Sequence, residues 1–124
     1  MALCPNRFAG TAYVKVDSEQ FALRGDLTIS IDPFERTGVA GLDGVHGYTE
    51  APRVPFIEGT FSDIRGLSLT RLQQMCDVTV TAEMVNGKTY LLSQAWTATA
   101  RELNAVEGSV SIRWEGITGT EIMP

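Results

Sequence analysis

Residues 78–97 read VTVTAEMVNGKTYLLSQAWT, and this stretch decides the fold. In its first half apolar residues alternate with polar ones, which is the pattern of a strand with one buried and one solvated face. The pair Asn86-Gly87 then separates this run from a second, mostly apolar run. Asn-Gly between two such runs predicts a β-hairpin with a type I′ turn, because both central residues of that turn need positive φ.

Strand chemistry recurs on both sides of the hairpin. Residues 10–16, 20–31, 54–62 and 110–115 are rich in β-branched and aromatic side chains and are bounded by turn residues. With the two runs of the hairpin they make about six strands, and their short connections favour antiparallel pairing. We therefore expect a mainly β fold, an antiparallel β-sandwich or barrel.

Two segments depart from the strand pattern. Over residues 68–76, leucine and methionine recur at mixed spacing among good helix formers, which predicts one short α-helix flanking the sheets. Residues 33–53 hold four glycines and show neither the helical nor the strand period. They are expected to form one long loop, and loops beyond about 12–15 residues in compact domains are usually functional. On a compact scaffold such a loop most often contacts another molecule.

Length and charge restrict the class of protein. The 124 residues fit a single domain, residues 1–124, with one core. The net charge of −5 argues against nucleic-acid binding, because sequence-independent affinity for phosphates needs clustered Lys and Arg, and no specific nucleic-acid binding is expected. No apolar run reaches the roughly twenty residues that span a bilayer, and the N-terminus does not read as a secretory signal. Synthesis and folding in the cytoplasm, without membrane insertion, are expected.

The sequence offers little material for catalysis. His46 is the only histidine, and the only cysteines are Cys4 and Cys76, so no metal-ligand spacing or Ser-His or Cys-His pair stands out. The Gly-rich segment contains neither of the common phosphate-binding motifs. We expect no enzyme activity, no cofactor and no metal, and a role in association.

Three segments carry a resemblance to a known family. GVAGLDGVHGYTEAPRVPFIEGTFSD, then VTAEMVNGKTYLLSQAW, then EGSVSIRWEG follow one another in the order and spacing of phage tail tube proteins of the Mu-like, contractile-tailed type. The chain resembles this family over about residues 8–121, and related tubes occur in type VI secretion systems and phage-tail-like bacteriocins.

The resemblance implies a structural virion protein, the protomer of hexameric rings that stack into the tail tube through which DNA is ejected. Its partners would be further copies of itself and the tail sheath, baseplate and tail-terminator proteins, with the tape-measure protein and DNA in the lumen. The tail would be assembled in the cytoplasm of the bacterial host. The loop at about residues 33–53 would reach an adjacent ring. The candidate interface residues are Val39, Leu42, Asp43, Val45, His46, Tyr48 and Arg53.

In such a tube, acidic side chains on the lumen wall would let DNA pass without sticking, because like charges repel and no counterions are released. The polar faces of the best strands supply the candidates, although each could equally face outer solvent or the sheath. The candidate lumen-facing residues are Glu58, Thr60, Thr79, Thr81 and Glu83.

Two other hypotheses about the function stay open. One is the tube protein of a bacteriocin or a type VI secretion-like system, whose protomer obeys the same physics. The other is a small β-barrel module that binds a peptide or carbohydrate, with Tyr48, Phe56 and Trp96 as aromatic anchors. That module would be a monomer with an apolar groove.

Overall fold

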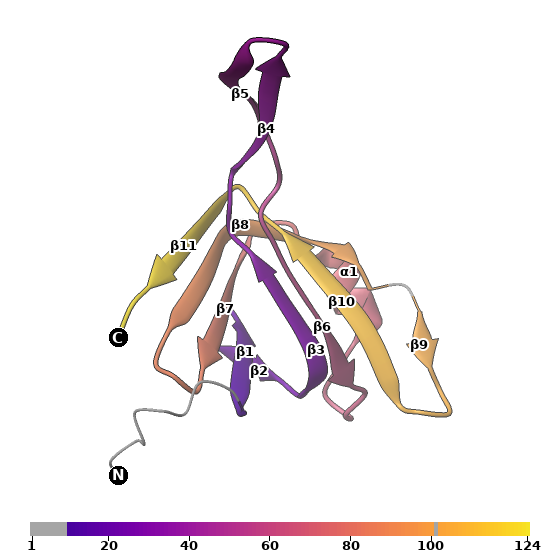
Figure 1. Ribbon diagram of the computed structural model, residues 1–124. Helices are drawn as coiled ribbons and strands as arrows, with labels where there is room; N and C mark the ends of the chain where they lie inside the picture. The colour runs from indigo at the N-terminus through magenta and orange to yellow at the C-terminus, as the bar shows by residue number, and fades with distance from the viewer. Residues whose placement is uncertain (1–9, 101) are drawn as a thin grey trace.

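The computed structural model describes residues 10–100 and 102–124, which form eleven strands and one helix. Figure 1 shows how these elements are arranged. The strands are β1 (Ala12–Val16), β2 (Glu19–Phe21), β3 (Leu23–Ser30), β4 (Phe34–Gly41), β5 (Gly44–Pro52), β6 (Phe56–Ser62), β7 (Val78–Met84), β8 (Thr89–Thr99), β9 (Leu103–Asn104), β10 (Ser109–Glu115) and β11 (Thr118–Ile122). The helix, α1, is Leu69–Gln74.

Nine strands form one sheet that folds over on itself. Its order is β2-β1-β7-β8-β10-β6-β3, with β11 added to β8 and β9 added to β10, and every pairing is antiparallel. Strands β4 and β5 form a separate two-stranded sheet. The predicted class, mainly antiparallel β with one short helix, is confirmed.

Strand β8 joins the two halves of the folded sheet. Its first part pairs with β7 and β11, and its last part pairs with β10. Between Val80↔Leu92 and Val78↔Ala95, β8 carries one residue more than β7, which is a β-bulge. Within it, Gln94 has φ +52°, and a bulge of this kind bends a strand and increases its twist. The bend takes β8 from one half to the other.

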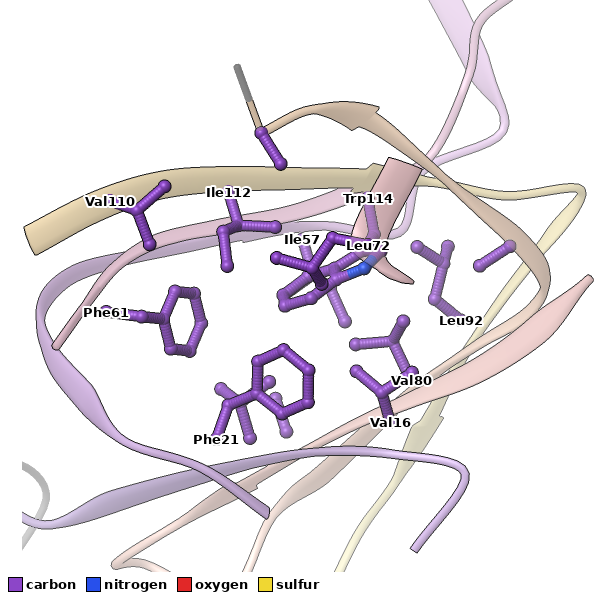
Figure 2. Close-up of a cluster of buried hydrophobic side chains, with 14 residues drawn as sticks. Val16, Phe21, Ile57, Phe61, Leu72, Val80, Leu92, Val110, Ile112 and Trp114 are labelled. Atoms are coloured by element: carbon purple, nitrogen blue, oxygen red, sulfur yellow. The ribbon is translucent and has the colours of Figure 1, made fainter. Parts of the chain in front are cut away.

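The core lies between the two halves. Figure 2 shows Ile112 and Trp114 of β10 facing Val80 of β7, with Phe21 and Phe61 beside them. The rings of Phe21, Phe61 and Trp114 meet edge to face at centroid distances of 5.5–6.0 Å. Such aromatic pairs contribute about 0.5–1.5 kcal/mol each beyond their buried area. The alternating inward side chains of β6, β7 and β10 therefore close one continuous core.

The helix is shorter than the expected span of residues 68–76. Ser68 is its N-cap, and its Oγ accepts a hydrogen bond from the backbone N–H of Arg71 at 3.3 Å. Met75 leaves the helix in an extended conformation, with ψ 112°. The helix is only six residues long, and Leu72 is its buried residue. Through Leu72, α1 covers one end of the core.

The turn between β7 and β8 differs from the predicted type I′. Gly87 has φ +92°, whereas Asn86 does not have positive φ. Gly87 N–H donates to the Met84 carbonyl at 3.1 Å, and Met84 N–H donates to the Lys88 carbonyl at 2.9 Å. The connection is thus a three-residue turn in which only the glycine takes the left-handed region. The hairpin itself is formed as expected.

The described chain has more strands than the six expected. The segment at residues 20–31 is divided at Ala22 into β2 and β3, and the short edge strands β9 and β11 carry too few residues to show a period. The expected irregular loop at residues 33–53 is also wrong, since it forms the strands β4 and β5. Both of its faces are solvated, so no apolar alternation marks it as strand.

The positive φ of Gln94 leads to a stability prediction. A left-handed conformation costs a non-glycine residue about 1–2 kcal/mol, and glycine avoids this cost. Gln94→Gly should therefore raise the free energy of unfolding by about 1 kcal/mol in urea titrations. In the neighbouring Ser93→Gly variant the glycine only adds entropy to the unfolded chain, so the same titration should show a loss of about 0.5–1 kcal/mol. Equal losses in both variants would contradict the role of the bulge.

Candidate functional site

The hairpin β4–β5 stands clear of the sandwich (Figure 1). Every residue of both strands is exposed. An isolated two-stranded hairpin is at best marginally stable in water, because it has no face to bury. Exposed apolar residues on such an element mark a surface that another molecule covers. This hairpin is the strongest candidate for a contact site in the described chain.

One face of the hairpin carries most of its large side chains. Residues directly opposite in an antiparallel pair share a face, and the pairs Phe34↔Pro52, Arg36↔Glu50 and Gly38↔Tyr48 all lie on the same side. The Arg36 guanidinium lies 5.2 Å from the centre of the Tyr48 ring, and its Nε is 3.4 Å from a Glu50 carboxylate oxygen. This aromatic face therefore has an ion pair at its centre, with Phe34 on the side of the hairpin base and Tyr48 on the side of the tip.

The tip of the hairpin carries two exposed aliphatic residues and the pair Asp43–His46. Leu42 is fully exposed and the side chain of Val45 is 83% exposed. His46 Nε2 lies 2.7 Å from Asp43 Oδ1, and this hydrogen bond lowers the pKa of the Asp43 carboxyl. The imidazole lies over Gly41, where a Cβ would come within 2.6 Å of the ring. The tip thus presents two aliphatic side chains beside an ionised carboxylate.

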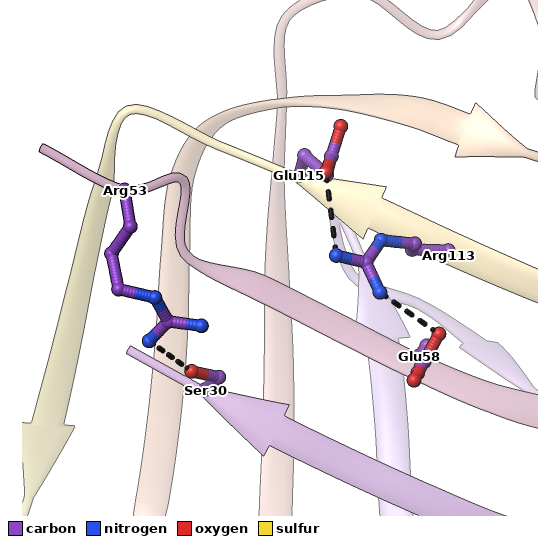
Figure 3. Close-up of polar contacts among 5 residues, drawn as sticks. All are labelled: Ser30, Arg53, Glu58, Arg113 and Glu115. Atoms are coloured by element: carbon purple, nitrogen blue, oxygen red, sulfur yellow. Dashed lines mark hydrogen bonds and ion pairs between the residues drawn. The ribbon is translucent and has the colours of Figure 1, made fainter. Parts of the chain in front are cut away.

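The base of the hairpin is held by Arg53. Its Nη1 donates to Ser30 Oγ at 2.6 Å and to the Asp32 carbonyl at 3.2 Å, and its backbone N–H donates to the Pro33 carbonyl at 2.9 Å (Figure 3 draws the bond to Ser30). On the adjoining leg, Ile31 lies so close to Gly119 of β11 that a Cβ there would be 2.9 Å from the Ile31 Cα. Both legs are therefore fixed to the sandwich.

The structure brings six of the seven candidate interface residues together on the projecting hairpin. Those six are Val39, Leu42, Asp43, Val45, His46 and Tyr48. Arg53 lies at the base, where it holds the hairpin in place. The sequence reasoning missed Phe34, which is 47% exposed and shares the face of Tyr48. The paired glycines at Gly41 and Gly44, which flank a two-residue turn, were the signal that could have revealed the register.

The candidate lumen residues divide between two opposite surfaces. Glu58 and Thr60 lie on β6 and point away from the core, since their neighbours Ile57 and Phe61 point into it. The other three lie on the outward side of β7, in the opposite half of the folded sheet. They are Thr79, Thr81 and Glu83. If one half of the sheet lines a lumen, only one of these sets faces it.

The outward side of β3, β6 and β10 is polar and acidic. Two adjoining clefts on it share a floor of hydroxyl groups from Thr60, Thr99 and Ser111. Their charged lining consists of the carboxylates Asp26, Glu58, Glu102 and Glu107 and the guanidinium of Arg113. Figure 3 shows Arg113 between two carboxylates, 3.2 Å from Glu58 and 3.4 Å from Glu115. This surface therefore carries an excess of negative charge.

The outward side of β1, β7, β8 and β11 differs in composition. Exposed apolar side chains lie there, including Tyr13 and Ile122 at 45% and 46% exposure. Its Lys15 and Glu83 form an ion pair at 3.4 Å. This surface is mixed, with apolar side chains and charges of both signs.

Within residues 10–100 and 102–124, no cluster of three or more His, Cys, Asp or Glu side chains is arranged to hold a metal ion. None of the helices in that same part of the chain is long and apolar enough to cross a bilayer. His46 is half-exposed and contacts Asp43, and Cys76 is a free, exposed thiol. Cys4 lies outside the described residues.

The fold and its projecting hairpin define a β-sandwich domain with a surface suited to contact another chain. The particular family follows from the sequence: this chain belongs to the phage tail tube protein family, whose sequence model matches residues 5–121. Among curated proteins, none matches the chain significantly.

Solved structures share the fold at low sequence identity. The sheath/tube terminator of the extracellular contractile injection system PVC, in its extended state, superposes with a TM-score of 0.60 and 13% identity, over 90% of this chain and 93% of that one. The tube-terminating cap of the anti-feeding prophage AFP gives 0.60 and 14% over 100% of both chains. A chain of the PVC sheath-tube complex gives 0.58 and 14%, over 91% and 88%.

The contacts of Arg53 lead to a second prediction. Arg53→Ala removes the hydrogen bonds to Ser30 and Asp32 that fix the base of the hairpin. Hydrogen bonds from a charged group contribute about 1.5–3 kcal/mol, so local opening should be favoured and the Arg53 backbone amide should exchange with deuterium at least about tenfold faster. Arg36→Ala, which removes the exposed ion pair with Glu50 and the contact with the Tyr48 ring but no bond at the hairpin base, should leave that amide unchanged. Identical exchange in both variants would contradict the clamp.

Proposed function

We propose that this protein is a structural virion protein, the protomer of hexameric rings that stack into a phage tail tube and conduct DNA into the host. The observation that carries the proposal is the match to the phage tail tube family over residues 5–121. Its role is structural and not catalytic. It assembles with further copies of itself in the host cytoplasm and then, in the virion tail, with sheath, baseplate and tail-terminator proteins around the tape-measure protein and the DNA.

The open edges of the sheet support lateral assembly. In the described chain the nine-stranded sheet ends at β2 and at β3, and one edge each of β9 and β11 has no neighbour. Unpaired N–H and C=O groups along such edges are a liability for a monomer and a template for pairing with another copy. Head-to-tail contacts between identical subunits close into rings where the rotation allows, and stacked rings form a tube.

The hairpin supports contact between rings. It presents the tip Leu42, Asp43 and Val45 at one end of the domain, far from the sheet edges that lateral pairing would use (Figure 1). Every residue of its two strands is exposed. Burial against the next ring would remove the apolar tip from water and stabilise the hairpin itself.

Surface charge supports one side of the sandwich as the lumen wall. We place Glu58 and Thr60 on the lumen wall, because their side of the sandwich has hydroxyl groups and an excess of carboxylates. DNA passing such a wall meets like charge and releases no counterions, so it does not adhere. The side of Thr79, Thr81 and Glu83, with exposed Tyr13 and Ile122, suits contact with other proteins and faces outward in this arrangement.

A second candidate is the tube or the tube terminator of a contractile injection system that carries no genome. The similar structures of the PVC terminator and the AFP cap favour it. Negative-stain electron microscopy of the purified protein across a concentration series separates a tube protomer from a tube terminator. Tubes of uniform width support a tube protomer, single rings that never stack support a terminator, and a strict monomer contradicts both.

Removal of the hairpin should prevent stacking without unfolding the protomer. The Arg53 N–H to Pro33 O hydrogen bond holds the two legs side by side, so residues 34–52 can be replaced by a two-residue Asn-Gly connection. The variant should keep the native circular dichroism spectrum and a cooperative melt, yet form no tubes by electron microscopy. Normal tubes from this variant would overturn the role of the hairpin in stacking.

Cysteine labelling of assembled tubes should identify the lumen face. In a background with Cys4→Ser and Cys76→Ser, Thr60→Cys should react with a small maleimide but not with a large polyethylene-glycol maleimide that cannot enter the tube. Thr81→Cys, on the opposite surface, should react with both reagents. Dissociated protomers of both variants should react with both. The reverse pattern in tubes would place β7 on the lumen wall.

A further inference from the structure

The sandwich has an apolar opening on its flank, between β3 and the β7–β8 pair. The sheet does not close there, since β3 and β2 are the two ends of its path. The opening is a cleft of about 400 Å³. Its apolar walls are Leu27, Ile29 and Ile31 from the side of β3, Met84 at the end of β7, and Tyr90 on β8.

These wall residues extend the hydrophobic core to the surface of the domain. All five are only half-buried, and Leu27, Ile29, Met84 and Tyr90 pack against the fully buried cluster from its rim. Apolar side chains that converge on an open cleft favour an apolar occupant, because covering them releases water from both surfaces. The backbone edge of β3 beside them has no partner strand in the described chain, so an added strand could also pair with it.

The charged residue that lines the cleft is a cation. Lys88 and Asn86, from the β7–β8 turn, lie at the rim. Tyr90 stays protonated, because a hydrogen bond with Glu121 raises the pKa of its hydroxyl. The cation at this rim suits an occupant that carries a carboxylate beside aliphatic side chains.

We propose that this cleft receives the hairpin tip of a second copy of the same chain. The tip matches it in chemistry: Leu42 and Val45 provide exposed aliphatic groups, and Asp43 provides a carboxylate whose lowered pKa keeps it ionised. In contact, the two aliphatic side chains fill the apolar walls while Asp43 approaches Lys88. The inference rests on the proposed function and names the surface that the hairpin uses.

The hairpin tip and the cleft lie at different places on the domain, so the same contact can form again between each copy and the next. The hairpin projects from one end of the domain, and the cleft extends to the β7–β8 turn at the opposite end (Figure 1). A contact between two different surfaces leaves one free hairpin and one free cleft on every pair, and because these lie at opposite ends of the domain, further copies add end to end. Such a contact generates a filament of stacked rings and does not stop at a dimer.

Disulfide trapping tests the proposal directly. In full-length protein with Cys4→Ser and Cys76→Ser, the double variant Leu42→Cys, Met84→Cys has one thiol on the tip and one in the cleft. Under mild oxidation it should give a ladder of covalent multimers on a denaturing, non-reducing gel. Each single variant should give at most dimers, because it has one thiol per copy. Ile29→Cys provides a second cleft position for use where Met84→Cys weakens the fold.

The control pair is Leu42→Cys with Thr81→Cys, which places the second thiol on the outward side of β7 and should give no ladder. The same samples are viewed by electron microscopy. Tubes without a ladder at either cleft position would overturn the cleft as the receiving surface while leaving the tube function in place. A ladder without tubes would support the contact and contradict the tube function. Absence of both would overturn both.

A second experiment tests whether a different segment fills the cleft. Gly10, where the described chain begins, lines the cleft, so residues 1–9 of the same copy are the competing occupant. Met84→Cys in dissociated protomers should react with a small maleimide at the same rate in full-length protein and in a variant that starts at Gly10. A rate that increases about tenfold or more on removal of residues 1–9 would overturn the proposal.

Discussion

The structure depends on one strand that belongs to both halves of the sheet. The eleven residues of β8 pair first with β7 and β11 and then with β10, and the change takes place at the bulge that contains Gln94. Without the bend, the inward side chains of β7 and β10 would lie on one flat surface and no core would form. With it, Val80 and Trp114 face the same interior, and the three aromatic rings fill the space between them.

The orientation of the hairpin follows from that core. Strands β3 and β6 are neighbours in the sheet, and β4 and β5 extend from them beyond the point where the sheet ends. Arg53 and the close contact of Ile31 with Gly119 hold the two legs at this point. The apolar tip therefore has a direction set by half-buried residues at its base, although every residue of the hairpin itself is exposed. A contact element of this kind is preorganised, which reduces the entropy lost on assembly.

The likeness to contractile injection system proteins at 13–14% identity has a physical basis in the same arrangement. Core positions in a β-sandwich accept many apolar side chains as long as volume and alternation are kept. The surface is then free to vary, and in this chain it divides into an acidic, hydroxyl-rich side and a mixed side. That division follows from the pleat of the strands, which sends every second residue outward.

The sequence by itself determined the β class, the β7–β8 hairpin and the short helix, because period-two alternation and turn and cap residues such as Gly87 and Ser68 act over a few neighbouring positions. It also singled out residues 33–53 as a segment for contacts, and the family resemblance supplied the tail tube assignment that the match confirms. Its assignments of interface and lumen residues stay predictions. Only the tertiary structure decided that the segment is a hairpin, that Arg53 anchors it, and that Glu58 and Thr81 lie on opposite surfaces. These features depend on which strands become neighbours, and pairing between distant segments leaves no mark in local periodicity.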